Sequence, residues 1–177
     1  MREVCSVCHH RCELDEGQTG FCRARKNTDG AVACCNYGMI TSIALDPIEK
    51  KPLRNFHPGS KVLSVGSWGC NMSCEFCQNY RISMSNGEKL RSAFIPYTEL
   101  VQIANDSKSE GNIGLAFTYN EPLISYEYLL DCAHEAVKLD LKIIAVTNGC
   151  FTKETAEKVL PHIDALNIDL KSFNPLF

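Results

Sequence analysis

The pattern of apolar and polar residues changes near residue 61. Residues 1–60 carry only short apolar alternations, such as 37–45, among many Cys, Gly, Pro and charged residues. We expect them to form a small Cys-rich N-terminal head with hairpin-like segments. From residue 61 onward, short apolar runs alternate with stretches in which apolar residues recur at helical spacing. The chain therefore divides into a head over 1–60 and a second region over 61–177.

The second region repeats the order of strand and helix. Four apolar or alternating runs predict strands, over 62–65, 113–118, 143–146 and 166–171. Helices are expected after Thr98, over 129–137 with Cys132 on the apolar stripe, and after Thr152, because Thr is a suitable N-cap. This alternation indicates an α/β fold with parallel crossovers, as in a βα barrel or a doubly wound sheet.

Polar or ligating residues follow each expected strand. The four strand ends are Gly69-Cys70-Asn71, Thr118 to Pro122, Thr147-Asn148-Gly149 and Asp169-Leu170-Lys171. In parallel α/β folds the loops at the carboxyl ends of the strands converge over one face. Four such ends in register along the repeat therefore predict a shared pocket.

Charge and composition exclude some classes of partner. Eighteen Lys and Arg against 21 Asp and Glu give a net charge of -3, so no broad basic surface is expected and a nucleic-acid partner is disfavoured. The N-terminus lacks the apolar segment of a signal peptide, and no apolar run approaches the roughly 20 residues that cross a bilayer. We expect a cytoplasmic protein without a membrane partner.

Three of the eleven cysteines lie close together in GCNMSCEFCQN, as Cys70, Cys74 and Cys77. Zinc sites normally use four protein ligands, whereas three thiolates on one loop suit an iron-sulfur cubane with one iron left open. Three cysteines cannot pair internally as disulfides. A structural zinc site completed by a remote cysteine is the rival interpretation.

A second group of cysteines has the spacing C-x2-C-x3-C-x9-C, as Cys5, Cys8, Cys12 and Cys22. Four thiolates with glycines nearby predict a closed tetrahedral zinc site, and a second iron-sulfur cluster is the alternative. The remaining cysteines show no ligand spacing and are expected to be small buried apolar residues, namely Cys34, Cys35, Cys132 and Cys150.

The loop GCNMSCEFCQN resembles the signature of the radical S-adenosylmethionine (SAM) superfamily. The resemblance implies a [4Fe-4S] cluster on Cys70, Cys74 and Cys77 whose open iron binds the amino and carboxylate groups of SAM. It implies reductive cleavage of SAM to a 5'-deoxyadenosyl radical that abstracts hydrogen, with an electron donor such as flavodoxin or ferredoxin. Phe76 matches the apolar position near the adenine.

Three further segments extend the resemblance to pyruvate formate-lyase activating enzymes. FTYNEP resembles the second-strand motif and implies that Glu121 accepts from the SAM amino group. VTNG resembles the third-strand motif, with Thr147 and Asn148 matched. In NIDLKSF the resemblance places Lys171 at the SAM carboxylate and Asp169 beside it.

Together with DPIEKKPL and NFHPGS, these segments resemble the radical SAM component of the AmmeMemoRadiSam system. That branch implies a partial (βα) barrel, which this chain would interrupt after about four strands. The resemblance leaves two classes of substrate open. One is a backbone glycine of a partner protein, which would become a glycyl radical, and the other is a small molecule. The alternatives are a non-catalytic metal-binding protein, an inactive fragment of such an enzyme and a zinc-ribbon adaptor.

Overall fold

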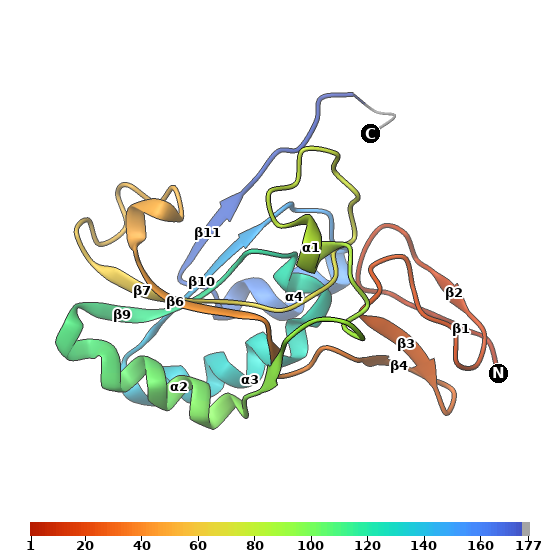
Figure 1. Cartoon of the computed structure of the whole chain (residues 1–177), viewed down its shortest axis with the longest axis horizontal. Helices are drawn as coiled ribbons and strands as arrows, with labels where there is room; N and C mark the ends of the chain where they lie inside the picture. Colours follow the sequence, from red (N-terminus) through yellow and green to blue (C-terminus); the bar gives the residue numbers. More distant parts are fainter. Residues whose placement is uncertain (175–177) are drawn as a thin grey trace.

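The computed structural model describes residues 1–174 and is built around a five-stranded sheet of order β11-β10-β9-β7-β6 (Figure 1). Its strands are β6 (Ser42–Pro47), β7 (Lys61–Gly66), β9 (Asn112–Phe117), β10 (Lys142–Thr147) and β11 (Ala165–Ile168). Four of them are parallel, and β6 pairs with β7 in the antiparallel direction. The predicted α/β class with a mostly parallel sheet is confirmed.

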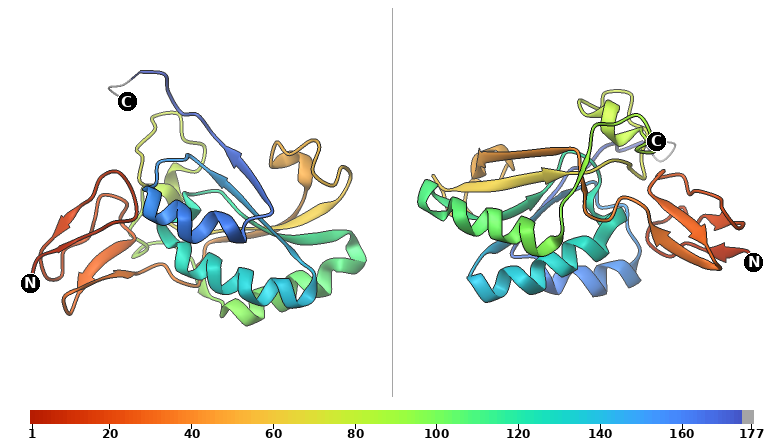
Figure 2. Two further views of the ribbon diagram at one scale, coloured as in Figure 1. Left: turned by 180° about the vertical axis from the view of Figure 1, so that it is seen from behind. Right: turned by 60° about the horizontal axis from the view of Figure 1, so that its bottom comes forward.

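Three helices cover one face of this sheet, as both views of Figure 2 show. They are α2 (Tyr97–Asp106), α3 (Tyr126–Ala136) and α4 (Lys153–Val159). Their apolar stripes pack against alternate residues of the strands, including Leu63, Leu115 and Ile143. Each fully buried Leu or Ile stabilises this contact by about 1.5–3 kcal/mol. On the opposite face of the sheet lies a second, smaller apolar cluster of Ile48, Val62, Ala116 and Ile144.

Short elements complete the region beyond the main sheet. The 3-10 helices are η1 (Ile48–Lys50), η2 (Ser107–Glu110), η3 (Pro122–Ser125), η4 (Val137–Leu139) and η5 (Leu160–His162). A single helical turn, α1 (Tyr80–Ser83), follows the cysteine loop.

The end of β7 lies close to the end of the neighbouring strand β9. A Cβ added at Gly66 would be 2.9 Å from the Thr118 carbonyl oxygen, so this position requires glycine.

The first residues of α2 and α4 test the prediction that Thr98 and Thr152 are N-caps. Thr152 caps α4, and its hydroxyl accepts from the Thr155 amide, so that prediction is confirmed. Thr98 does not cap α2, which begins at Tyr97 directly after the extended Pro96, without a side-chain cap. The ring of Pro96 fixes its φ, Pro96 itself stays extended, and the helix begins at the next residue. Val137, expected on the α3 stripe, lies beyond the helix with 74% of its surface exposed.

The head consists of short antiparallel pairs beside the sheet (Figure 1). β1 (Glu3–Val4) pairs with β2 (Glu13–Leu14), and β3 (Arg25–Thr28) pairs with β4 (Ala31–Cys34). β5 (Met39–Ile40) pairs with β8 (Ala93–Phe94), and β6 already belongs to the main sheet. The sheet therefore takes one strand from the first 60 residues.

Hydrogen bonds attach the head to the start of α4. The Thr152 hydroxyl donates to the Ser6 carbonyl at 2.7 Å, and the Thr155 hydroxyl donates to the Val7 carbonyl at 2.9 Å. The buried Arg25 forms an ion pair with Glu127 on α3. The head therefore packs at the same end of the molecule as the carboxyl ends of the strands.

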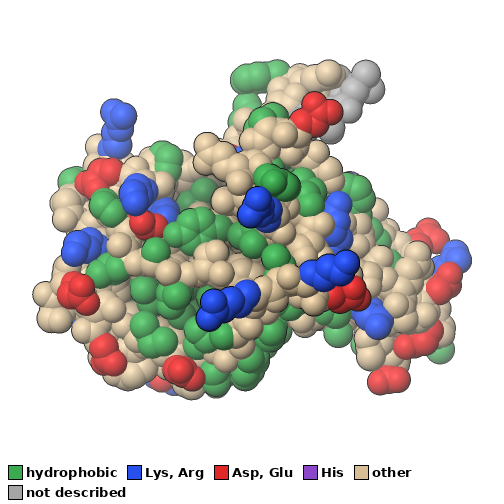
Figure 3. Space-filling view, viewed as in Figure 1, with side chains coloured by type: hydrophobic (Ala, Val, Ile, Leu, Met, Phe, Trp, Pro, Cys, Tyr) green, Lys and Arg blue, Asp and Glu red, His purple; other side chains and the backbone are tan. Residues whose placement is uncertain are grey.

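The surface carries mixed charge. On the face drawn in Figure 3, Lys and Arg side chains are scattered among acidic and apolar ones and form no continuous basic area. Within residues 1–174, no helix has both the length and the apolar character needed to span a membrane.

Candidate functional site

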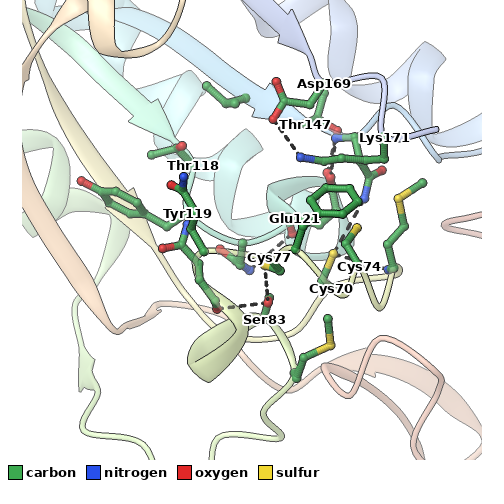
Figure 4. A pocket seen from close by; sticks show the side chains of 18 residues that line it. Cys70, Cys74, Cys77, Ser83, Thr118, Tyr119, Glu121, Thr147, Asp169 and Lys171 are labelled. Atoms are coloured by element: carbon green, nitrogen blue, oxygen red, sulfur yellow. Dashed lines mark hydrogen bonds and ion pairs between the residues drawn. The ribbon is translucent and has the colours of Figure 1, made fainter.

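A cavity of about 350 Å³ lies at the carboxyl ends of the parallel strands. Every residue that the sequence assigns to the [4Fe-4S] cluster of the cysteine loop or to SAM lines it, namely Cys70, Cys74, Phe76, Cys77, Glu121, Thr147, Asn148, Asp169 and Lys171. Figure 4 shows the three cysteines together, with Glu121 near them and the Asp169–Lys171 pair alongside. The structure therefore brings four separate strand ends to one pocket.

The cysteine loop connects β7 to α1 and is shaped by its own turns. The Cys77 amide donates to the Cys74 carbonyl at 3.2 Å, and the Met72 amide donates to the Cys70 sulfur at 3.4 Å. The Cys77 sulfur lies 3.2 Å from the Ser83 hydroxyl. All three thiols are free. Burial raises the pKa of Cys70 to about 12, with Glu121 among the further causes.

Three free thiols on one loop, facing an open cavity, fit a cluster rather than a single ion. Within residues 1–174, no three Cys, His, Asp or Glu side chains are grouped so that they could hold one metal ion. A cubane binds each thiolate at a different iron, so its ligands do not have to meet at one point. The donor set and the space beside it therefore suit a [4Fe-4S] cluster.

Glu121 is 3% exposed and bridges the ends of β9 and β10. Its Oε1 accepts from the Thr147 hydroxyl at 2.7 Å, and its Oε2 accepts from the Asn148 amide at 2.8 Å. The Leu123 amide adds a third donor at 3.0 Å. Burial raises its pKa, although these three hydrogen bonds oppose the shift. Since a carboxylate offers about four lone-pair sites, one more donor can bind.

Asp169 and Lys171 lie just beyond β11 and form an ion pair of 3.0 Å. Burial lowers the pKa of Lys171, but the hydrogen bond and charge of Asp169 outweigh it and raise that pKa overall. The strand expected over 166–171 ends at Ile168, so this part of the prediction is wrong. Asn167, expected on the same face, does not line the cavity.

The turn after β9 has a left-handed backbone at a residue other than glycine. Tyr119 adopts a φ of +71°, in the left-handed region that glycine favours and that is strained for a large residue. Its ring points away from the cysteines in Figure 4, and its hydroxyl donates to Asp46 at 3.0 Å. Asn120 accepts from the Ser67 amide at 3.0 Å. Contacts of Tyr119 and Asn120 with neighbouring segments therefore hold this strained turn.

The N-terminal cysteines lie in the head, outside this pocket. Cys5, Cys8 and Cys22 are buried and Cys12 is half-buried. Burial raises the pKa of Cys8 to about 11, and the neighbouring Cys22 and Cys5 contribute to the rise. The four cysteines therefore share one part of the head.

The cysteines without ligand spacing were expected to be buried. Cys132 is buried in the core, which confirms the prediction for that residue. Cys35 is exposed and Cys34 and Cys150 are half-buried, so the prediction is wrong for these three. Their places in a hairpin and a loop leave them fewer neighbours than a helix stripe provides.

The pocket, with its cysteine loop, lies within the part of the chain that matches a known family. Residues 66–177 match the radical SAM superfamily. The chain belongs to this superfamily. Membership implies a [4Fe-4S] cluster and SAM as cofactors, and it supports an enzyme.

Two relatives of this radical SAM chain are longer than it is. The uncharacterized protein MJ0808 of Methanocaldococcus jannaschii is 37% identical over 167 residues, which cover 94% of this chain and 49% of that protein. The 4-hydroxyphenylacetate decarboxylase activating enzyme of Clostridioides difficile is 29% identical over 113 residues, 60% of this chain and 34% of the enzyme. The matched segments therefore cover about half the length of the first relative and a third of the second.

Two polar residues were not predicted from the sequence: Ser83, which lines the pocket, and Asn71, which lies behind the cysteine loop. Ser83 reaches the Cys77 sulfur from α1, and no pattern in the sequence indicates it. Asn71 was noticed only as a neighbour of Cys70, yet it is 2% exposed and hydrogen bonded on several sides. The place of this polar residue directly beside Cys70 could have suggested that it helps to hold the cysteine loop.

Proposed function

We propose that the chain holds a [4Fe-4S] cluster on Cys70, Cys74 and Cys77 and binds SAM in the adjacent cavity. When both are bound, they supply one-electron cleavage of the sulfonium C–S bond of SAM, giving methionine and a 5'-deoxyadenosyl radical that abstracts hydrogen from a substrate. The observation that carries the proposal is the cavity itself, which three thiols of one loop share with polar residues from three other strand ends.

The polar residues of the cavity match the groups of SAM. Glu121 has one acceptor site left for the SAM amino group, while its other contacts fix the backbone of Asn148. Lys171 carries the positive charge for the SAM carboxylate, with Asp169 to orient it. Phe76 lies on the cavity wall with 62% of its surface exposed, which suits a contact with the adenine.

We propose that the sheet, which includes β6 from the first 60 residues, is the first part of a partial (βα) barrel, and that the rest of the head is a domain of its own. All three α-helices of five or more residues in the described part of the chain lie on one face of the sheet, as barrel strands require. The resemblance to the AmmeMemoRadiSam branch stays a prediction. The electron donor would be a flavodoxin or ferredoxin, in the cytoplasm.

The activating-enzyme relative indicates one class of substrate for this proposal. That protein is an activating enzyme for 4-hydroxyphenylacetate decarboxylase. By analogy, the substrate here would be a partner protein on which a glycyl radical forms. A small-molecule substrate is the alternative, and a non-catalytic metal-binding protein is the second candidate because the head has its own thiols.

The four head cysteines form the second proposed metal site. Cys8 hydrogen bonds with the backbone of His10, and Cys22 with the backbone of Ala24 and Arg25, which are contacts that favour thiolates. We propose zinc here, with a second iron-sulfur cluster as the alternative; binding would draw the thiols together as the head folds around the metal. Measuring zinc and iron in Cys12→Ala, which leaves the cysteine loop intact, tests this proposal.

Anaerobic reconstitution tests the proposed function. The wild-type chain should take up iron and sulfide and form 5'-deoxyadenosine from SAM and dithionite. Cys74→Ala should lose the cluster absorbance and the product but keep any metal in the head. Cys35→Ser is the matched control, because Cys35 is exposed and lies outside the pocket. Equal iron in Cys74→Ala and wild type, or zinc without SAM cleavage, would favour the non-catalytic protein.

A further inference from the structure

Asn71 connects the head to the pocket through three different groups. The His10 Nε2 atom lies 2.8 Å from the Asn71 carbonyl oxygen, and because a carbonyl only accepts, Nε2 carries the hydrogen. The Asn71 side chain donates to the Cys150 carbonyl at 2.5 Å. Its Oδ1 accepts from the Asn148 side chain at 2.8 Å. A buried residue with this many contacts is held in one orientation.

The contact between Asn71 and Asn148 orients a hydrogen-bond donor near the Cys70 sulfur. The Asn148 Nδ2 atom, which donates to Asn71, also lies 3.8 Å from the Cys70 sulfur. The Asn148 backbone is fixed from the other side by Glu121. The amide therefore points one hydrogen at Asn71 and the other toward the sulfur. Hydrogen bonds to ligand sulfurs are among the protein's means of setting the reduction potential of a cluster.

Residues of the head contact Asn71 and restrict its position. The His10 ring stacks on Phe21 with 4.3 Å between ring centroids, which fixes the imidazole that reaches Asn71. The Cys8 side chain also hydrogen bonds with the Asn71 side chain. Two residues of the head, Cys8 and His10, thus contact the loop that carries Cys70.

We propose that Asn71 is a positioning residue that directs the Asn148 amide onto the Cys70 sulfur, and that the head, through His10, fixes Asn71. This role rests on the proposed function, since it assumes that Cys70 binds the cluster. An N–H donor withdraws negative charge from the sulfur and favours the reduced cluster. Without it, the cluster should be harder to reduce, while its three cysteine ligands remain.

Two measurements test this role. In Asn71→Ala, iron content should match wild type, and the midpoint potential of the cluster should become more negative. In the chain without cluster, hydrogen exchange of residues 70–78 should become about fivefold to tenfold faster, as expected from losing one or two net hydrogen bonds. His10→Ala should show the same two changes. In His10→Gln, whose amide can still donate to the Asn71 carbonyl, the midpoint potential and the hydrogen exchange should both match wild type.

Arg2→Ala is the matched control, because Arg2 pairs only with exposed Glu13 and Asp15 inside the head. It should change neither measurement. An unchanged potential in Asn71→Ala with full iron content would overturn this role and leave the proposed function standing. A wild-type chain that takes up no iron would overturn the proposed function and this role with it. If Asn71→Ala does not fold, the two His10 variants decide the question.

Discussion

At the scale of single residues, buried polar groups define the site. Glu121 is the central one, since it gathers a hydroxyl and two backbone amides from two strand ends. An isolated Glu beside a proline is often solvated, and the sequence motif alone could not distinguish that case from this one. The structure separates them, because Glu121 is 3% exposed and accepts from the Thr147 hydroxyl and the Asn148 and Leu123 amides.

Glu121→Gln should destabilise the chain and weaken SAM binding. The NH2 of the new side chain cannot accept, so one buried donor loses its partner at a cost of about 1–3 kcal/mol. The free energy of unfolding in urea measures this loss. Glu75→Gln, on the exposed part of the cysteine loop, should stay within about 0.5 kcal/mol of wild type. Equal stability of Glu121→Gln and wild type would contradict the bridging role.

Asp46 gives a prediction about pH. It accepts hydrogen bonds from Lys50, Lys51, Ser64 and Tyr119. Burial alone raises its pKa, but the bonds from Lys51, Lys50 and Ser64 outweigh it and lower that pKa below its usual range. A lowered pKa contributes stability that is present above the unfolded value of about 3.9 and is lost as the pH falls.

Asp46→Asn should therefore be less stable than wild type at pH 7, by about 3–5 kcal/mol, because it leaves the buried Lys51 ammonium unpaired. The difference should shrink as the pH falls below about 4. Thermal unfolding across this range measures it. Asp29→Asn, at an exposed hairpin position, should stay within about 0.5 kcal/mol of wild type. A constant difference for Asp46→Asn would contradict the ion-pair account.

At the scale of elements, the strand and helix order was predictable and some boundaries were not. Uninterrupted apolar runs marked β7, β9 and β10 because both faces of these strands are covered. β6 was missed as part of the sheet, since its exposed residues give an edge strand without a strong pattern. Pro96, rather than Thr98, sets the start of α2, which shows that a capping residue type is not enough.

Thr152 and Thr98 make a matched pair for this point. Thr152→Ala removes an N-cap and a hydrogen bond to the head, so it should cost about 1 kcal/mol from the cap alone and more from the head contact. Thr98→Ala should change stability little, because Thr98 is exposed inside α2 and caps nothing. Urea unfolding of both variants gives the comparison. Equal losses would contradict the assignment of the cap.

At the scale of the whole molecule, the head and the pocket meet at Gly69. This residue has a φ of +84°, and an added Cβ would lie 2.5 Å from the Cys22 carbonyl oxygen. The sequence indicated a glycine turn before Cys70, but a contact between segments so far apart is not visible in any local pattern. The same limit applies to Asn71 and His10. Motif spacing predicts the cluster ligands, whereas only the structure shows the packing between the head and the loop that carries them.

Gly69→Ala should displace the head from the cysteine loop and destabilise the chain by more than backbone strain alone, which is about 1–3 kcal/mol. Gly30→Ala isolates the strain, because Gly30 also has a positive φ but has open space where the Cβ would lie. The extra loss in Gly69→Ala measures the close approach. Similar losses in both variants would show that the head does not press on this glycine.

The central claim is that the cluster on the cysteine loop keeps one iron free for SAM. Electron paramagnetic resonance of the reduced, reconstituted chain tests it most directly, with and without SAM. The account predicts a [4Fe-4S] signal whose g-values shift on adding SAM, and a smaller shift in Lys171→Ala. A cluster signal that SAM leaves unchanged in the wild-type chain would contradict it.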